Sequence, residues 1–227
     1  TSSMMGDYCP ETLQQSQSRQ NDEKIAFDSL LGEDTLTLDQ TSFPWILNHI
    51  DCFVSQSRGN KNIELVFLCP YAFNGHDDGV WDKVGQAVGN LQELRRLYIS
   101  SDRENDNDSD SEDEDEDPPN PDWERLARIL SHMRQKISVY FADSIVLTVQ
   151  ESRSFARAIR GHPTIASFND GKSFPYESVD SLYSALATLP ALESIQLSSS
   201  YQFAMPEHET HHESLTELLR VPSLRSV

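Results

Sequence analysis

A pair of mostly apolar residues, separated by one residue, recurs along this chain about every 30 residues. The pairs that align are Leu36/Leu38, Val66/Leu68, Leu97/Ile99, Tyr140/Ala142, Phe168/Asp170 and Ile195/Leu197, with Val227 as the first member of a seventh pair. The steps are 27 to 32 residues, except for one step of 43. A period in this range is typical of repeat architectures, in which each unit buries its core against its neighbours. The pattern therefore predicts a stack of similar units.

A helical pattern precedes most of the pairs. Apolar residues at i, i+3 and i+4 form the stripes Trp81/Val84/Val88, Trp123/Leu126/Leu130, Phe155/Ile159, Leu182/Leu186 and Leu215/Leu219. This spacing gives a helix one buried face. Pro163, Pro190 and Pro222 follow three of these stripes and stop the helix. Each unit is thus expected to hold one helix and one short strand.

The units resemble a known repeat family. Two segments, Leu94-x-x-Leu97-x-Ile99 and Leu192-x-x-Ile195-x-Leu197, are similar to the strand signature of the leucine-rich repeat. The unit length of about 28 residues, with a helix, resembles the ribonuclease-inhibitor-like subtype, over roughly residues 24–227. The resemblance implies an α/β horseshoe solenoid of about six to seven degenerate repeats, with a concave parallel sheet and convex helices.

A doubly wound α/β domain is the alternative fold, because it also alternates strands and helices. Its strands are buried on both faces and are expected to be apolar on both. The segments Arg96–Ser100 and Ser194–Ser198 are apolar on one face only, apart from Tyr98. We therefore expect a sheet with one open face.

The chain divides by composition. Residues 1–21 are polar and lack periodicity, which predicts a disordered tail, and residues 22–227 form the repeat region. Residues 102–119 interrupt it with an acid run at 102–117, followed by two prolines, and we expect a disordered insertion there. The last repeat, ending at Val227, is expected to be truncated.

Charge and cysteine usage restrict the partners and the compartment. The net charge is −19, which disfavours binding to nucleic acid or to anionic membranes, because phosphate contacts need Lys and Arg. Cys9, Cys52 and Cys69 show no C-x-x-C spacing, which favours reduced thiols in the cytoplasm or nucleus. Within the acid run and beside it, Ser101, Ser109 and Ser111 each precede an acidic residue by three positions and are candidate phosphorylation sites.

The open sheet face is the expected binding site. With the pairs above facing inward, an aromatic and apolar patch faces outward, and its candidate partner-binding residues are Leu65, Phe67, Arg96, Tyr98, Val139 and Phe141. A patch of this size favours a protein partner. Two alternatives stay open: the tail or the acid run covers the patch, or a one-residue slip of a strand turns these side chains inward.

The expected function is a non-catalytic protein-interaction module with no cofactor and no metal. His208, Glu209 and His212 spell H-E-x-x-H, but Pro206 and polar neighbours give no apolar helix to bury a zinc site, so we do not expect an enzyme. The resemblance allows a substrate receptor of a ubiquitin ligase, whose nearest adaptor-like segment is Phe43–Phe53. A further alternative is that the acid run binds basic proteins such as histones.

Overall fold

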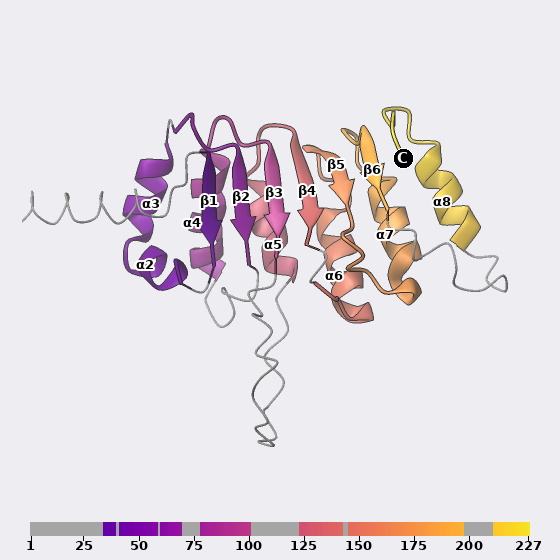
Figure 1. The fold of residues 1–227 in the computed structure, drawn as a ribbon, viewed down its shortest axis with the longest axis horizontal. Helices are drawn as coiled ribbons and strands as arrows, with labels where there is room; N and C mark the ends of the chain where they lie inside the picture. Colours follow the sequence, from indigo (N-terminus) through magenta and orange to yellow (C-terminus); the bar gives the residue numbers. More distant parts are fainter. Residues whose placement is uncertain are drawn as a thin grey trace, which may run out of the picture.

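Strands and helices alternate along the chain in the computed structural model (Figure 1). The structure describes residues 34–39, 41–58, 60–69, 78–100, 123–142, 145–197 and 211–227. The polar tail, the acid run with Ser101, Ser109 and Ser111, and the residues His208 and Glu209 lie outside this part, so the predictions about them stay predictions.

The strands are short, and the α-helices are longer than the strands. The strands are β1 (Thr35–Leu38), β2 (Leu65–Leu68), β3 (Arg96–Ile99), β4 (Ile137–Phe141), β5 (Ile165–Asn169) and β6 (Ser194–Gln196). The helices are α2 (Phe43–Asn48), α3 (Ile50–Ser57), α4 (Asp78–Gly89), α5 (Trp123–Ser131), α6 (Val149–Ile159), the 3-10 turn η2 (Tyr176–Ser178), α7 (Val179–Leu186) and α8 (His211–Leu219).

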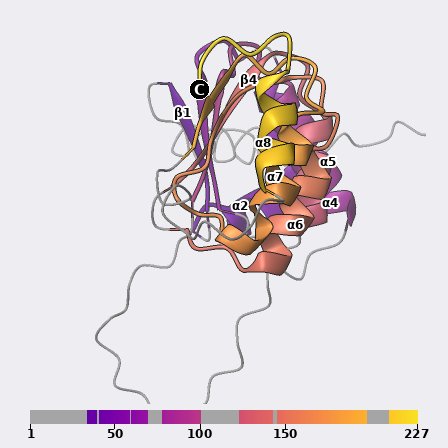
Figure 2. The same cartoon turned by 90° about the vertical axis from the view of Figure 1, so that its right-hand side faces the viewer.

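The described strands form one parallel sheet of six strands in the order β1-β2-β3-β4-β5-β6. Viewed along the row of strands, the helices lie in a second layer on one side of the sheet (Figure 2). The predicted α/β class with a parallel sheet is therefore confirmed. A doubly wound domain would reverse its strand order and carry helices on both faces, so that alternative is wrong.

The core lies between the sheet and the helix layer. Alternate strand residues such as Leu36, Val66, Leu97 and Ile195 are buried and meet the apolar stripes of the helices. The segment Phe43–Phe53 belongs to this core, because Phe43, Ile46 and Phe53 are almost fully buried. Its apolar side chains are therefore used within the fold.

Local sequence sets where the helices begin and how closely they approach. Thr148 caps α6: its hydroxyl accepts from the backbone N–H of Glu151, whose carboxylate accepts from the Thr148 N–H. This reciprocal capping box satisfies two donors that the first helical turn leaves open. Between α4 and α5, Gly89 leaves room for the backbone of His132, since a Cβ on Gly89 would lie 2.4 Å from the His132 carbonyl oxygen.

Strand β4 faces the opposite way from our expectation. Val139 and Phe141 are 0% and 3% exposed, whereas Ser138 and Tyr140 are only partly buried. The pair Tyr140/Ala142 is therefore the wrong one, and Val139/Phe141 is the inward pair. The physical reason is a cluster of aromatic rings beneath the sheet. Phe141 meets Phe155 and Phe174 there, each at a ring-centroid distance of 4.9 Å.

The predicted seventh strand has a counterpart at the end of the chain. Ser226 forms an isolated parallel bridge with Ser194 of β6, next to Val227. The Ile195 N–H donates to the Ser226 carbonyl, 2.9 Å away. The segment after α8 thus extends the sheet in the same direction as the other strands.

His162 links two neighbouring units, and its protonation makes the stability of the protein depend on pH. Its Nε2 lies 2.9 Å from the Leu130 carbonyl oxygen, and its Nδ1 accepts from the Thr164 N–H at 3.4 Å, so the neutral ring carries its proton on Nε2. Burial lowers the pKa of His162 below its usual 6.5, although the bond to Leu130 partly opposes this. The unfolded chain therefore takes up this proton more readily, and stability is lost as pH falls below about 6.5.

Replacing His162 with Gln is expected to flatten this pH dependence. Urea unfolding at a series of pH values from about 8 to about 5 measures the effect. The free energy of unfolding of the wild type should fall more steeply below about pH 6.5 than that of the variant. Parallel curves for the two proteins would show that His162 does not carry this proton linkage.

Candidate partner-binding face

The sheet face turned away from the helices presents two rows of side chains. In register across the six strands, the first row is Thr37, Phe67, Tyr98, Tyr140, Asn169 and Gln196. The second row is Thr35, Leu65, Arg96, Ser138, Ser167 and Ser194. No described helix lies over this face (Figure 2). We call it the open face.

Aromatic side chains occupy three neighbouring strands of the first row. Phe67 and Tyr98 meet edge to face with ring centroids 5.2 Å apart. Tyr140 lies beside Tyr98 in the register of β3 and β4. All three rings are partly exposed. They form what we call the aromatic ladder (Phe67, Tyr98 and Tyr140).

Outside the aromatic ladder and Leu65, the residues of the two rows are polar or charged. Leu65 is half-buried and lies beside the exposed Arg96, next to the aromatic ladder. Over β5 and β6 the side chains are small or carry amides, and Asn169 Nδ2 donates to Gln196 Oε1 at 3.0 Å. The Asn169 Oδ1 accepts from the backbone N–H of Gly171 at 3.0 Å. The apolar part of the face is therefore confined to β2, β3 and β4.

Four of the six residues that the sequence nominated lie on the open face. They are Leu65, Phe67, Arg96 and Tyr98. Val139 and Phe141 do not, because they are buried beneath the sheet, and this part of the prediction is wrong. The structure adds Tyr140, which the sequence pattern assigns inward. Ile137, Val139 and Phe141 alternate with Ser138 and Tyr140, but Tyr140 and Ala142 fit the repeat spacing as well, so the sequence of the strand alone does not decide which face is buried.

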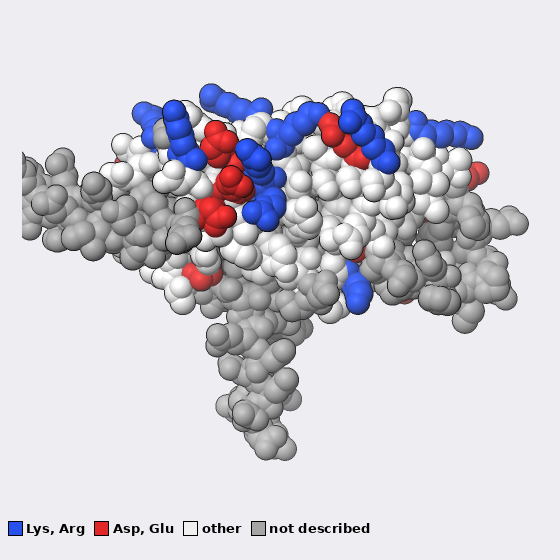
Figure 3. Space-filling view, turned by 45° about the horizontal axis from the view of Figure 1, so that its top comes forward, with Lys and Arg blue, Asp and Glu red and all other residues white. Residues whose placement is uncertain are grey.

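Charge is distributed unevenly around the edges of the sheet. The connections from a helix to the next strand, together with the segment after α8, carry the basic residues Arg58, Lys61, Arg95, Arg134, Lys136, Arg160, Arg220 and Arg225. Figure 3 shows Lys and Arg gathered along this edge. We call it the basic edge. The connection from Ile99 to Trp123, which contains the acid run, starts at the opposite edge.

Some basic residues of this edge are neutralised by neighbours. Lys136 hydrogen-bonds Glu193, and this bond and the ammonium charge lower the pKa of the Glu193 carboxyl. Arg95 lies 3.6 Å from a Glu93 carboxylate oxygen. These pairs are exposed, and pairs of this kind contribute little to stability.

The described ranges contain neither a metal-ligand cluster nor a membrane-spanning helix. No group of three or more His, Cys, Asp or Glu side chains close enough to hold a metal ion occurs among these residues. None of the described helices has both the length and the apolar composition that a membrane crossing requires.

Comparisons with known proteins identify no family. No protein-family model matches the chain, and no curated protein matches it. Among solved structures, the C-terminal domain of tropomodulin from Caenorhabditis elegans is similar with a TM-score of 0.34 and 11% sequence identity. The match covers 75% of this chain and 90% of that one. A similarity at this level assigns neither a family nor a function to the chain.

Proposed function

We propose that this chain is a non-catalytic protein-interaction module that binds a protein partner on the open face through the aromatic ladder. We further propose that its units are leucine-rich repeats of the ribonuclease-inhibitor-like kind, stacked as a horseshoe of six to seven repeats. The strand-helix period of about 30 residues and the sequential parallel strand order support this assignment. The binding proposal rests on one observation: three adjacent, partly exposed aromatic rings on a sheet face that no described helix covers.

The chemistry of the aromatic ladder suits a protein partner. A Phe or Tyr side chain buries roughly 150–250 Å² when it is fully covered, and Tyr is enriched among residues that dominate binding energy. The Tyr98 and Tyr140 hydroxyls add polar groups that can orient a partner. Because the strands hold the three rings in register, little conformational freedom is lost on binding, which favours affinity.

The same side chains argue for binding rather than catalysis. Among the twelve residues of the two outward rows, Arg96 is the single charged one. General acid-base chemistry needs a titratable group that works near neutral pH, such as a His or a tuned carboxyl, within reach of a substrate. The rows instead offer rings, hydroxyls and amides. We propose no reaction for this face.

The other candidate functions gain no support from the described residues. The adaptor-like segment Phe43–Phe53 packs into the core with α2 and α3, and its buried residues Phe43, Ile46 and Phe53 are unavailable to an adaptor protein. The ubiquitin-ligase function therefore stays a prediction. The histone-binding function also stays a prediction, because the acid run lies outside the described ranges.

Affinity purification from a native cell extract tests the proposal with two matched triple variants. The first replaces Phe67, Tyr98 and Tyr140 with Ala. The second replaces Ser167, Asn169 and Gln196 with Ala, on the polar end of the same face. Circular dichroism checks that both variants are folded. We expect the first variant to lose a partner that the wild type and the second variant retain, with an affinity at least ~30-fold weaker, since one hot-spot residue contributes about 2 kcal/mol or more.

Two results would contradict the proposal. One is a folded aromatic variant that recovers the same partner as the wild type with the same affinity. The other is loss of the partner from the polar variant alone, which would move the site to β5 and β6.

A further inference from the structure

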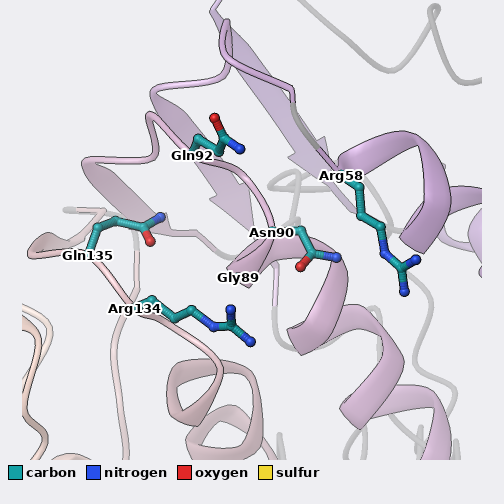
Figure 4. Close-up of a pocket in the computed structure, with 6 residues that line it drawn as sticks. All are labelled: Arg58, Gly89, Asn90, Gln92, Arg134 and Gln135. Atoms are coloured by element: carbon teal, nitrogen blue, oxygen red, sulfur yellow. The ribbon is translucent and has the colours of Figure 1, made fainter.

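A hollow of about 420 Å³ opens on the basic edge, beside the ends of α3, α4 and α5 (Figure 4). Its lining residues are Arg58, Gly89, Asn90, Gln92, Arg134 and Gln135. Arg58 follows directly after α3, Gly89 ends α4 and Asn90 follows it. Arg134 and Gln135 lie between α5 and β4. The lining therefore comes from three successive units of the repeat. The hollow lies apart from the aromatic ladder, so a ligand there is independent of a partner on the open face.

Two of the lining residues are arginines that no carboxylate of the described residues neutralises. Arg58 and Arg134 are both exposed, and within the described ranges neither forms an ion pair. Other basic residues, such as Arg128 and Lys136, are paired with an aspartate or a glutamate. In a chain with a net charge of −19, two unneutralised guanidinium groups around one hollow are a local positive field.

A buried amide lies between the two guanidinium groups. In Figure 4 the Asn90 side chain is seen between Arg58 on one side and Arg134 on the other. Its Nδ2 is buried and has no hydrogen-bond partner among the described residues. A buried donor without an acceptor costs about 1–3 kcal/mol, so a ligand oxygen that reaches Nδ2 when the amide turns toward the hollow would recover that loss. Asn90 is thus an independent sign that the hollow takes a group rich in acceptor oxygens.

The frame around these donors is held by the fold. Gln135 Nε2 donates to the Leu91 carbonyl oxygen at 2.8 Å, which fixes that side chain on the α4–β3 connection. The close approach of Gly89 to the His132 backbone holds the end of α4 against the end of α5. Asn90 and Arg134 are therefore carried by backbone segments that pack directly on one another.

The ends of helices offer a simpler explanation for basic residues at this edge. A helix C-terminus carries about −0.5 charge, which favours a basic residue in the last turn or just after it. This accounts for one basic residue near each helix end. It does not account for two unneutralised arginines and an unpaired amide donor around the same hollow. Two full positive charges also exceed the partial charges of the helix ends.

From this arrangement we propose that the hollow binds a phosphate group. Together the two arginines carry two positive charges, which balance the two negative charges of a phosphate dianion. Each planar guanidinium group can also donate two parallel hydrogen bonds to two phosphate oxygens. Asn90 Nδ2 supplies a further donor, and the Gln92 amide is within the same lining. The ligand is either free phosphate or a phosphate group on a phosphorylated peptide, since both present the same oxygens.

Titration calorimetry with inorganic phosphate tests the site, at constant ionic strength set by sodium chloride. The variants are Arg58→Gln, Arg134→Gln and Asn90→Asp, and Arg220→Gln is the matched control. Arg220 is an exposed arginine of the same edge that does not line the hollow. Because the replaced side chains are exposed or at a helix end, the variants should fold, and circular dichroism checks this.

We expect saturable binding of one phosphate by the wild type and by Arg220→Gln. Each hollow arginine variant should bind ~10- to 100-fold more weakly, which corresponds to the loss of a charge-assisted hydrogen bond. Asn90→Asp should weaken binding at least as much, since it sets a carboxylate against the ligand. Affinity should also fall as pH drops through the second pKa of the phosphate, because the dianion then takes up a proton and becomes a monoanion.

A second titration identifies the source of the phosphate. A phosphoserine peptide is compared with the same peptide unphosphorylated. Binding of the phosphopeptide alone, lost in Arg134→Gln, assigns the hollow to a phosphorylated segment, whereas binding of inorganic phosphate alone assigns it to the free ion. The proposal is overturned if the wild type shows no saturable binding of either. It is also overturned if Arg220→Gln weakens binding as much as Arg134→Gln, because the effect would then be general edge charge.

Discussion

Replacing Phe141 with Ala is expected to lower the free energy of unfolding by about 3–5 kcal/mol, the range for removing a buried aromatic side chain. Phe141 is 3% exposed and lies among Trp123, Phe155, Phe168 and Phe174, with ring-centroid distances of 4.9 to 6.2 Å. The truncation would leave a cavity in the middle of this cluster, which its neighbours fill only partly. Urea unfolding followed by circular dichroism measures the change.

The neighbouring residue on the same strand is the matched control. Tyr140→Ala removes a ring of similar size from the open face, where it is partly exposed. We expect it to cost less than about 1 kcal/mol, the scale of a single cross-strand side-chain pair. If Tyr140→Ala destabilised the protein more than Phe141→Ala, then β4 would face the way that the sequence pattern indicates, and the aromatic ladder would lose its third ring.

Gly171→Ala is expected to destabilise the protein by roughly 2–5 kcal/mol, through two separate costs. Gly171 has φ = +53°, a conformation that L side chains rarely adopt. An added Cβ would also lie 2.1 Å from the Phe141 carbonyl oxygen and 2.7 Å from its carbon, so the end of β4 would have to move. The substitution should therefore shift the midpoint of urea unfolding strongly.

Gly161 separates the two costs. Its φ is +69°, but a Cβ there would meet no atom within 4 Å. Gly161→Ala is thus expected to cost only the conformational part, about 1–2 kcal/mol. Equal losses from the two substitutions would mean that the Phe141 carbonyl accommodates the methyl group, and that the close approach between the β5–α7 connection and β4 is not rigid.

Much of the fold could be predicted from the sequence because its strands are amphipathic. In β2 and β3, apolar residues such as Val66 and Leu97 alternate with residues that lie on the other face of the sheet. Because side chains alternate between the two faces, this pattern determines which face is buried. The helices were equally clear, since stripes such as Trp81, Val84 and Val88 match a helical period. The parallel order followed from the repeat, because each unit places its strand beside the previous one.

Strand β4 could not be predicted in this way because apolar residues occur on both of its faces. Tyr140 and Ala142 satisfy the pattern as well as Val139 and Phe141 do. The choice is made by tertiary packing: Phe155 and Phe174, distant in sequence, leave a place for a ring that Phe141 fills. The position of Tyr140 in the aromatic ladder therefore depends on side chains from α6 and from the connection after β5, which the sequence of β4 does not specify.

The hollow on the basic edge escapes sequence-based prediction for a different reason. The sequence shows a basic residue soon after several helix ends, such as Arg58, Arg134 and Arg160. That pattern alone is explained by the helix dipole. Only the structure shows that Arg58 and Arg134 line one hollow with Asn90, and that Asn90 Nδ2 has no hydrogen-bond partner within the described part of the chain.

The central claim is that a partner covers the open face, and hydroxyl-radical footprinting of the chain with and without its recovered partner tests it most directly. Tyr98 and Tyr140 report on the open face, and Phe141 is a buried internal control. Tyr176, in η2 and outside the two rows of the open face, is the reference. We predict that the partner protects Phe67, Tyr98 and Tyr140 and leaves Tyr176 unchanged. Unchanged oxidation of all three rings in a complex shown to be fully formed would contradict the account.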